Sequence, residues 1–279
     1  LARGPPSLPV ITSLRNSHIR GAIRLRKRGM RDRDREFLVE GVTGIGEAFS
    51  SGLPVRVLFV EVERKGAPTR SPKVAGLAAR CPGRVLEVSP PVMHALSAAT
   101  TPPGAVAVSP FVDLDPERLL ERRIHLALVL VEVRDPGNLG TILRTAWAGG
   151  VDAVFLGEGT VDAYNSKCVR AAAGALFHVP FARRVAIPWL LAELGSRGIR
   201  RIMATPRSQT FYDQIDMTGP SALVFGNEAW GLGEDVEAWA DERASIPMAG
   251  PVESRADSLN VALSVAVFLF EAARQRRGA

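Results

Sequence analysis

The C-terminal half of the chain alternates between short apolar runs and longer amphipathic stretches, and this alternation constrains the fold more than any other feature of the sequence. The apolar runs predict strands, and the amphipathic stretches predict helices. Strands are expected at residues 126–132, 153–156, 201–204 and 222–225, and helices at residues 138–149, 166–175, 188–198 and 258–277. This order predicts an α/β domain whose parallel sheet is covered by helices on both faces.

The N-terminal half is predicted to form a smaller α/β domain. Helices are expected at residues 13–29, 35–51, 72–80 and 91–97, and strands at residues 55–60, 85–88 and 105–108. We expect this domain to span residues 1–110 and the larger domain to span residues 123–279. Residues 111–122 contain Pro116 and four acidic side chains, which favours a linker with room for a short helix.

Composition excludes several classes of protein. Of the 279 residues, 46% are hydrophobic and 23% are charged, which indicates a folded chain. The longest apolar run, residues 261–270, is about half of what a membrane span needs, and the N-terminal residues lack the pattern of a signal peptide. Only Cys81 and Cys168 occur, without the spacing of zinc ligands. We therefore expect a cytoplasmic protein without a membrane anchor or a metal site.

Basic side chains are concentrated in the N-terminal half. Residues 1–122 carry 19 basic and 12 acidic side chains, whereas residues 123–279 carry 16 and 17. In the helix predicted near the start of this basic half, four basic side chains would lie on one face and form a basic stripe: Arg20, Arg24, Lys27 and Arg31. A polyanion such as RNA is the expected partner of this stripe. The alternative is a solvated helix face that binds nothing.

Three segments follow predicted strands of the larger domain, where open α/β sheets bind their ligands. In the first segment, Pro136 and Gly137 form a turn, and Asn138 is suited to cap the N-terminus of the next helix. Arg144 lies about two turns into that helix. Because helix N-termini attract anions, this segment is a candidate phosphate site. A capped turn followed by a surface arginine is the alternative.

The second and third segments are each weak signals when taken alone. In the second, a strand ends at Gly226, where the missing Cβ would let a ligand approach the backbone, and the polar Glu228 follows. In the third, residues 244–248 precede Ser258, which is suited to be an N-cap, and Asn260, which is expected early in the last helix.

Together, in this order, the three segments resemble the motifs of the SpoU/TrmH branch of the SPOUT RNA methyltransferases. Pro136-Gly-Asn-Leu-Gly140 with Arg144 resembles the first motif, and Phe225-Gly-Asn-Glu228 resembles the second. Ile246-Pro-Met248 with Ser258-Leu-Asn-Val-Ala262 resembles the third. Residues 10–109 are similar, with a looser pattern, to the ribosomal-protein-like (L30e-like) substrate-binding domain of this family.

The resemblance implies a ribose 2′-O-methyltransferase that uses S-adenosylmethionine, with a C-terminal trefoil knot and a homodimer that completes each active site. The RNA-facing and catalytic positions of the family fall on Asn138, Arg144, Glu228, Ser258 and Asn260. The cofactor would be held mainly by backbone around Thr205, Gly226, Ile246, Met248 and Leu259. A dimer is also expected because the helix predicted at residues 258–277 is apolar on nearly all sides before its basic end.

The chemistry of arginine restricts what Arg144 can do in such a reaction. Its guanidinium is a poor base, because the pKa of arginine lies above about 12. We therefore expect Arg144 to hold the target phosphate and to stabilise negative charge that develops on the ribose oxygen.

The N-terminal ribosomal-protein-like domain favours 23S rRNA as the target, with uridine as the expected nucleotide. A self-resistance enzyme of the avilamycin or thiostrepton kind is one expected subfamily. The alternatives are a tRNA 2′-O-methyltransferase, a base methyltransferase of the same superfamily, and an RNA-binding protein of the same fold that lacks activity.

Overall fold

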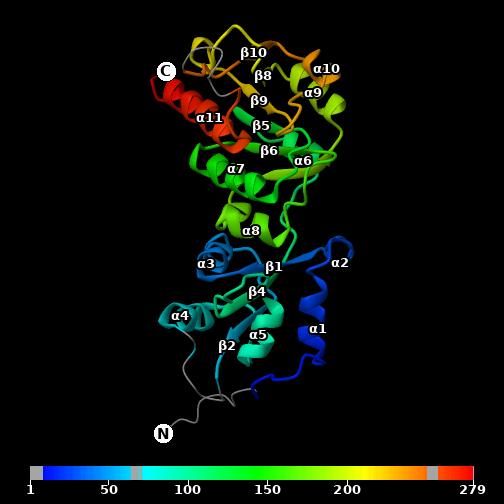
Figure 1. Cartoon of the computed structure of the whole chain (residues 1–279), viewed down its shortest axis with the longest axis vertical. Helices are drawn as coiled ribbons and strands as arrows, with labels where there is room; N and C mark the ends of the chain where they lie inside the picture. Colours follow the sequence, from blue (N-terminus) through cyan, green and yellow to red (C-terminus); the bar gives the residue numbers. More distant parts are fainter. Residues whose placement is uncertain (1–8, 64–68, 70, 250–256, 279) are drawn as a thin grey trace. The chain divides into compact units, whose positions relative to one another are not determined.

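The chain divides into two compact units, which we describe separately. In the computed structural model, residues 9–63, 69, 71–249 and 257–278 are described. Unit 1 comprises Leu1–Val112 and Asp162–Phe177, and unit 2 comprises Asp113–Val161 and His178–Ala279 (Figure 1). The first division falls within residues 111–122, where the sequence predicts a linker. The segment 162–177 is different, because it follows a strand of unit 2 in the chain but packs within unit 1.

Unit 1 contains a four-stranded sheet with the order β1-β4-β2-β3, in which β2 and β3 are parallel and β4 is antiparallel to both of its neighbours. Its strands are β1 (Glu36–Glu40), β2 (Val57–Glu61), β3 (Arg84–Val88) and β4 (Ala105–Pro110). Its helices are α1 (Ser17–Arg24), α2 (Arg28–Asp34), α3 (Val42–Ser50), α4 (Pro72–Arg80), α5 (Pro90–Leu96) and α8 (Ser166–Ala172), with a 3₁₀ turn at Ala175–Phe177. The prediction of a small α/β domain is confirmed.

The predicted helix at residues 13–29 is wrong, because the chain forms two short helices, α1 and α2, with a break between them. Lys27 has an extended backbone and precedes α2. The side chain of Arg31, which was predicted to lie on the basic stripe, is buried and 5% exposed. Its guanidinium donates to the carbonyl oxygens of Leu25 and Arg26, both at 2.9 Å, and to Asp162 Oδ2 at 2.6 and 3.1 Å. Arg31 therefore holds the turn between the helices instead of facing solvent.

The predicted helix at residues 35–51 is also wrong in its first part, where β1 precedes α3. Phe37 and Val39 are fully buried and pair with Ser109 and Ala107 of β4. A short buried apolar run looks the same in a strand and in a buried helix, so periodicity alone does not separate the two. Gly41 then precedes α3 as its N-cap with a φ of 86°, a conformation that favours glycine.

Unit 2 contains a six-stranded parallel sheet with the order β10-β8-β9-β5-β6-β7, which confirms the predicted α/β class. Its strands are β5 (Leu126–Leu130), β6 (Ala153–Gly157), β7 (Phe181–Val185), β8 (Arg200–Ala204), β9 (Ser221–Phe225) and β10 (Glu242–Ala244). Its helices are α6 (Pro116–Leu120), α7 (Pro136–Ala148), α9 (Ile187–Ser196), α10 (Glu234–Glu237) and α11 (Val261–Arg277), with a 3₁₀ turn at Tyr212–Gln214. The sequence did not predict β7 or β10.

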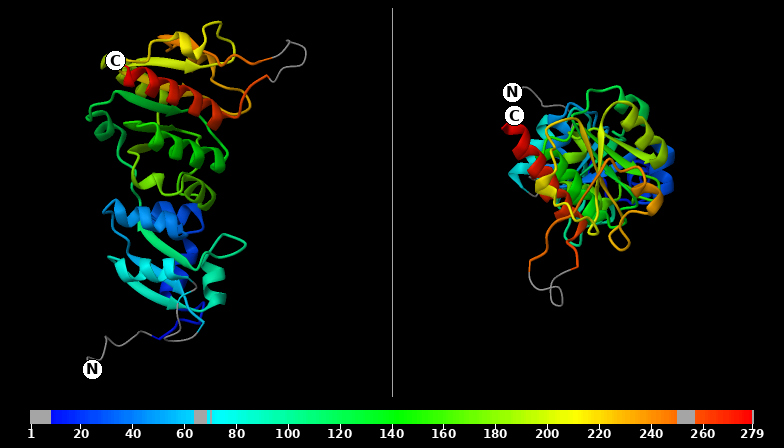
Figure 2. Two further views of the ribbon diagram at one scale, coloured as in Figure 1. Left: turned by 90° about the vertical axis from the view of Figure 1, so that its left-hand side faces the viewer. Right: turned by 90° about the horizontal axis from the view of Figure 1, so that it is seen from above.

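Helices cover both faces of the unit 2 sheet, and every residue of β5, β6 and β9 is buried. One face packs into an apolar core with α6, α9 and α10. On the other face, α7 and α11 lie side by side (Figures 1 and 2). Because all six strands are parallel, their carboxyl ends meet at one edge of the sheet, and the loops there come from distant parts of the sequence.

Candidate functional site

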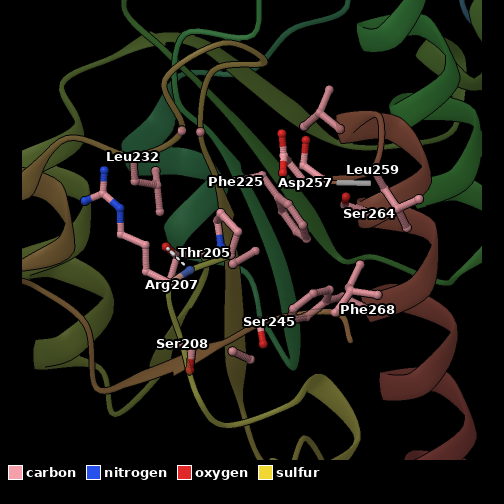
Figure 3. Close-up of a pocket in the computed structure, with 18 of the residues that line it drawn as sticks. Thr205, Arg207, Ser208, Phe225, Leu232, Ser245, Asp257, Leu259, Ser264 and Phe268 are labelled. Atoms are coloured by element: carbon pink, nitrogen blue, oxygen red, sulfur yellow. Dashed lines mark hydrogen bonds between the residues drawn. The ribbon is translucent and has the colours of Figure 1, made fainter. Parts of the chain in front are cut away.

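A pocket of about 680 Å³ lies at this edge, beyond the carboxyl ends of β8, β9 and β10 and beside the first turns of α11 (Figure 3). The five residues for which the resemblance implies cofactor contact all line it: Thr205, Gly226, Ile246, Met248 and Leu259. Two of the five expected RNA-facing and catalytic residues, Glu228 and Ser258, also line it. Sequence-distant segments thus converge on one cavity.

The pocket combines an aromatic wall with polar groups. Phe225 from β9 and Phe268 from α11 meet edge to face, with ring centroids 5.4 Å apart, and both lie beside the cavity in Figure 3. Thr205 accepts a hydrogen bond at Oγ1 from the backbone N–H of Arg207 at 3.4 Å. The sequence pattern assigns no pocket role to Phe225, although it begins the second motif, or to Phe268, because buried apolar residues of a strand and a helix have no separate binding signature.

Gly226 is needed at its position for a reason that adds to the predicted approach of a ligand. A Cβ on Gly226 would lie 2.2 Å from the backbone carbon of Gly231. The loop after β9 folds back on itself, and the backbones of Asn227 and Gly231 exchange hydrogen bonds of 2.9 and 3.0 Å. The glycine therefore permits the tight loop that presents Glu228 at the pocket wall.

A chain of hydrogen bonds joins the three motifs. Asn138 Nδ2 donates to Glu228 Oε1 at 3.1 Å, and Asn260 Nδ2 donates to Asn138 Oδ1 at 3.0 Å. The backbone N–H groups of Arg134 and Asp135 donate to the Glu228 carboxylate at 3.1 and 3.2 Å. The structure therefore brings Asn138, Glu228 and Asn260 together in one network.

The two helix caps differ from those predicted, and the difference explains the network. Asp135 caps α7, because its Oδ1 accepts from the N–H groups of Gly137 and Asn138. Asn260, and not Ser258, caps α11, because its Oδ1 accepts from the Ala262 N–H at 2.9 Å. Asn138 is thereby left with a free side-chain amide for Glu228, and the amide nitrogen of Asn260 is left for Asn138.

The charge of Glu228 is stabilised by these neighbours. Burial would raise the pKa of the Glu228 carboxyl, but the hydrogen bonds from Asn138 and from the backbone N–H groups outweigh burial and lower it. Glu228 is therefore ionised well below neutral pH and acts as a fixed acceptor, not as a proton donor.

We expect Glu228→Gln to lower the free energy of unfolding by about 1 kcal/mol. Three N–H donors bind the two carboxylate oxygens of Glu228, whereas glutamine offers only one acceptor oxygen. The effect is small because solvent screens this exposed group. The folded-state pKa of Glu228 lies below its ordinary value of 4.5. The ionised carboxylate therefore stabilises the fold fully at pH values above 4.5, and this contribution is lost as the pH falls through the lower pKa of the folded state. Urea unfolding of both proteins from pH 7 to pH 3 tests this, and a difference that grows on acidification would contradict it.

Arg144 stands apart from the pocket. It lies on α7 and is exposed, and it does not line the cavity. In the described part of the chain, its guanidinium forms no hydrogen bond or ion pair with another side chain. A guanidinium in this position is available to bind a phosphate.

The basic stripe of unit 1 is reduced to three residues, because Arg31 is buried. Arg20, Arg24 and Lys27 line a shallow pocket of about 350 Å³ together with Ile23 and Met30. All three cations are exposed, and Arg24 also pairs with Asp34 at 2.9 Å.

The described residues provide neither a membrane-spanning helix nor a cluster of metal ligands. They contain no helix with the length and apolarity needed to cross a bilayer. Among them, no group of three or more histidine, cysteine, aspartate or glutamate side chains is arranged to hold a metal ion.

Two family models match the chain. Residues 125–270 match the model described as the SpoU rRNA Methylase family. Residues 16–107 match the model described as an MRM3-like substrate binding domain. The first match contains Asn138, Arg144, Glu228 and Asn260, and the second contains Arg20, Arg24 and Lys27.

The chain is also similar to individual proteins over most of its length. It is 32% identical over 260 residues to the 23S rRNA (guanosine(2553)-2′-O)-methyltransferase RlmP of Bacillus subtilis. The aligned region covers 93% of this chain and 97% of that protein. It is 33% identical over 261 residues to the 23S rRNA (uridine(2479)-2′-O)-methyltransferase of Streptomyces viridochromogenes. This alignment covers 90% of this chain and 87% of that protein. The structure of the SpoU methyltransferase AviRb from Streptomyces viridochromogenes in complex with the cofactor AdoMet superposes with a TM-score of 0.83 at 29% identity, covering 95% and 100%.

Proposed function

The chain belongs to the SpoU rRNA methylase family, as its three motifs predicted, and on this premise we propose that it methylates a ribose 2′-hydroxyl of 23S rRNA with S-adenosylmethionine. The observation that carries the proposal is that the second and third motifs line one pocket, and that the network of Asn138, Glu228 and Asn260 joins the first motif to them. The two named relatives modify a guanosine and a uridine, so they do not fix which nucleotide this chain methylates. Nucleoside mass spectrometry identifies it.

The pocket fits S-adenosylmethionine in size and chemistry. Its volume of about 680 Å³ lies within the usual range for small-molecule sites. Phe225 and Phe268 offer apolar surface for an adenine, and Asp257 and Ser264 offer polar groups for the charged end of the molecule. Thr205, Gly226, Ile246, Met248 and Leu259 would hold the cofactor, largely through their backbone. When bound, it supplies a methyl group that its positively charged sulfur has already activated.

The protein's main task is then to orient the ribose hydroxyl. We assign the positioning of the target nucleotide to Arg144, which binds its phosphate and stabilises the negative charge that develops on the 2′-oxygen. Glu228 keeps Asn138 and the start of α7 in place. The trefoil knot of the C-terminal segment is part of the same proposal and is carried by the family resemblance alone.

A homodimer is the assembly that we propose. The exposed side chains of Leu263 and Phe270, at 56% and 50%, lie seven positions apart on α11 and so share one face of it. Trp147 on the adjacent α7 is also exposed, at 41%. Pairing two copies through this face would bury these side chains and bring Arg144, on the same helix as Trp147, close to the partner.

We propose that unit 1 captures the RNA in the cytoplasm. The exposed side chains of Arg20, Arg24 and Lys27 supply charge for this task. Replacing all three by alanine should reduce the slope of log affinity against log salt by about two units, because each lost phosphate contact on single-stranded RNA removes about 0.7. The rate of methyl transfer at saturating RNA should be retained. An unchanged salt slope, measured by filter binding, would show that these side chains do not contact phosphate.

The proposed function is tested by incubating the full chain with 23S rRNA transcript and methyl-labelled S-adenosylmethionine. Nuclease digestion and mass spectrometry of the nucleosides then locate the label. We expect it on a ribose 2′-oxygen. Label on a base would identify a base methyltransferase, transfer to tRNA alone would change the target, and cofactor binding without transfer to either RNA would indicate a non-catalytic RNA-binding protein.

A further inference from the structure

Trp230 has an unusual environment for a tryptophan. It lies in the tight loop after β9, two positions beyond Glu228, and it lines the pocket. Its side chain is nevertheless 54% exposed. Exposing a large apolar surface is unfavourable unless a partner covers it, and a tryptophan at the rim of a binding pocket is therefore a candidate contact for a ligand.

The indole ring is held in place by Arg134. The guanidinium carbon of Arg134 lies 4.8 Å from the ring centroid, and its Nη2 pairs with Glu132 Oε2 at 3.2 Å. The backbone N–H of the same arginine donates to Glu228 Oε2 at 3.1 Å. The aromatic ring, the cation and the carboxylate network of the site are thus parts of one arrangement.

The backbone two residues before Arg134 adopts an unfavourable conformation. Glu132 is a non-glycine residue with a φ of 54°, in the left-handed region. Its carbonyl oxygen accepts a hydrogen bond from Asn227 Nδ2 at 2.8 Å, in the loop that carries Trp230. Such strain persists where surrounding contacts enforce it and is frequent at functional sites.

A second arginine–tryptophan pair in the same unit shows what distinguishes Trp230. The guanidinium carbon of Arg201 lies 6.0 Å from the ring centroid of Trp239, which is 36% exposed. That arginine is committed to Asp241, with bonds of 2.7 and 2.6 Å, and Trp239 does not line the pocket. The Trp239 pair therefore serves as a matched control from the same chain.

We propose that the indole of Trp230 is a platform on which a nucleobase of the substrate RNA stacks, with Arg134 facing a neighbouring phosphate. This inference rests on the proposed function. Proteins recognise RNA largely through unstacked bases that lie on aromatic or guanidinium planes, and such stacking contributes about 1–3 kcal/mol per base. Trp230 would then fix the nucleotide whose ribose is to be methylated, or its neighbour, beside the pocket.

The test compares full-length Trp230→Ala, Trp230→Phe and Trp239→Ala with the wild type. We expect Trp230→Ala to weaken binding to 23S rRNA transcript by about 5- to 150-fold, the range that corresponds to about 1–3 kcal/mol. The affinity for S-adenosylmethionine should stay within about twofold, because stacking engages the RNA and not the cofactor. Trp230→Phe should retain most of the RNA affinity, because every aromatic ring offers a stacking face. RNA should quench tryptophan emission less in Trp230→Phe than in the wild type.

Three results would overturn the inference, and each is distinct from a failure of the proposed function. If Trp230→Ala loses cofactor affinity by the same factor as RNA affinity, the indole covers the cofactor instead. If it binds RNA as Trp239→Ala does, no base stacks on it. If Trp230→Phe binds as poorly as Trp230→Ala, a shape specific to tryptophan is required and stacking is not the cause. Because RNA binding is measured without cofactor, the comparison holds even if the wild type transfers no methyl group.

Discussion

Replacing Arg144 by alanine should lower the single-turnover rate of methyl transfer by about two orders of magnitude or more. This is the usual scale for the loss of one preorganised charge at a reacting centre. The affinity for cofactor should be unchanged, because Arg144 does not line the pocket. Most of the RNA affinity should also remain, because Arg20, Arg24 and Lys27 lie in the other unit and are intact.

Arg144→Lys is the informative companion to this variant. A lysine retains the charge but lacks the planar fork that binds a phosphate through two parallel hydrogen bonds, so it should restore little of the rate. Rates are measured at saturating RNA and cofactor. A near-normal rate for Arg144→Ala would remove this residue from the mechanism, and full rescue by lysine would reduce its role to that of a point charge.

Replacing Arg31 by alanine should lower the free energy of unfolding by about 3–5 kcal/mol, because it removes the guanidinium that compensates the buried charge of Asp162. The two side chains are only 6% and 5% exposed and lie 2.6 Å apart. The matched control is Arg20→Ala, a substitution on the exposed surface that should change stability by less than about 0.5 kcal/mol. Urea unfolding measures both.

A double variant separates the charge effect from simple loss of packing. Arg31→Met with Asp162→Leu removes both charges and keeps apolar volume, so it should recover most of the lost stability. If the double variant is as unstable as Arg31→Ala, then the hydrogen bonds of Arg31 to the carbonyl oxygens of Leu25 and Arg26 are its main contribution. If Arg31→Ala is as stable as Arg20→Ala, the buried pair does not stabilise unit 1.

The fold of unit 2 follows closely from sequence pattern where the pattern is strong. The buried apolar runs of β5, β6 and β9 and the amphipathic α7 were each predicted within a few residues. The edge strands β7 and β10 were missed. β7 contains Arg183 and Arg184, and β10 has only three residues, so neither shows the apolar run that marks a buried strand.

The predictions for unit 1 were weaker because its local pattern is ambiguous. Charge spacing suggested one continuous helix around Arg24 and Lys27, but a buried ion pair between Arg31 and Asp162 favours a turn there. Asp162 lies 131 positions away in the sequence. No local pattern reveals such a partner, and the packing of residues 162–177 into unit 1 was missed for the same reason.

For the site, resemblance identified residue types at the right positions, but their roles needed the structure. Asn138 and Ser258 were predicted as helix caps, whereas Asp135 and Asn260 cap the helices. Several residues compete for each cap within a few positions, and propensity does not choose among them. Trp230 was missed altogether, although an aromatic side chain two positions after a motif carboxylate is a signal worth weighing in a chain expected to bind RNA.

Mapping of ribose methylation in rRNA tests the central claim most directly. Large-subunit rRNA is compared among cells with the gene, without it, and without it but supplied with either the wild type or Arg144→Ala. We predict a 2′-O-methyl mark in 23S rRNA that is lost with the gene, returns with the wild type and does not return with Arg144→Ala. An rRNA methylation pattern that is the same with and without the gene, or the loss of a base methyl group in its place, would contradict the proposal.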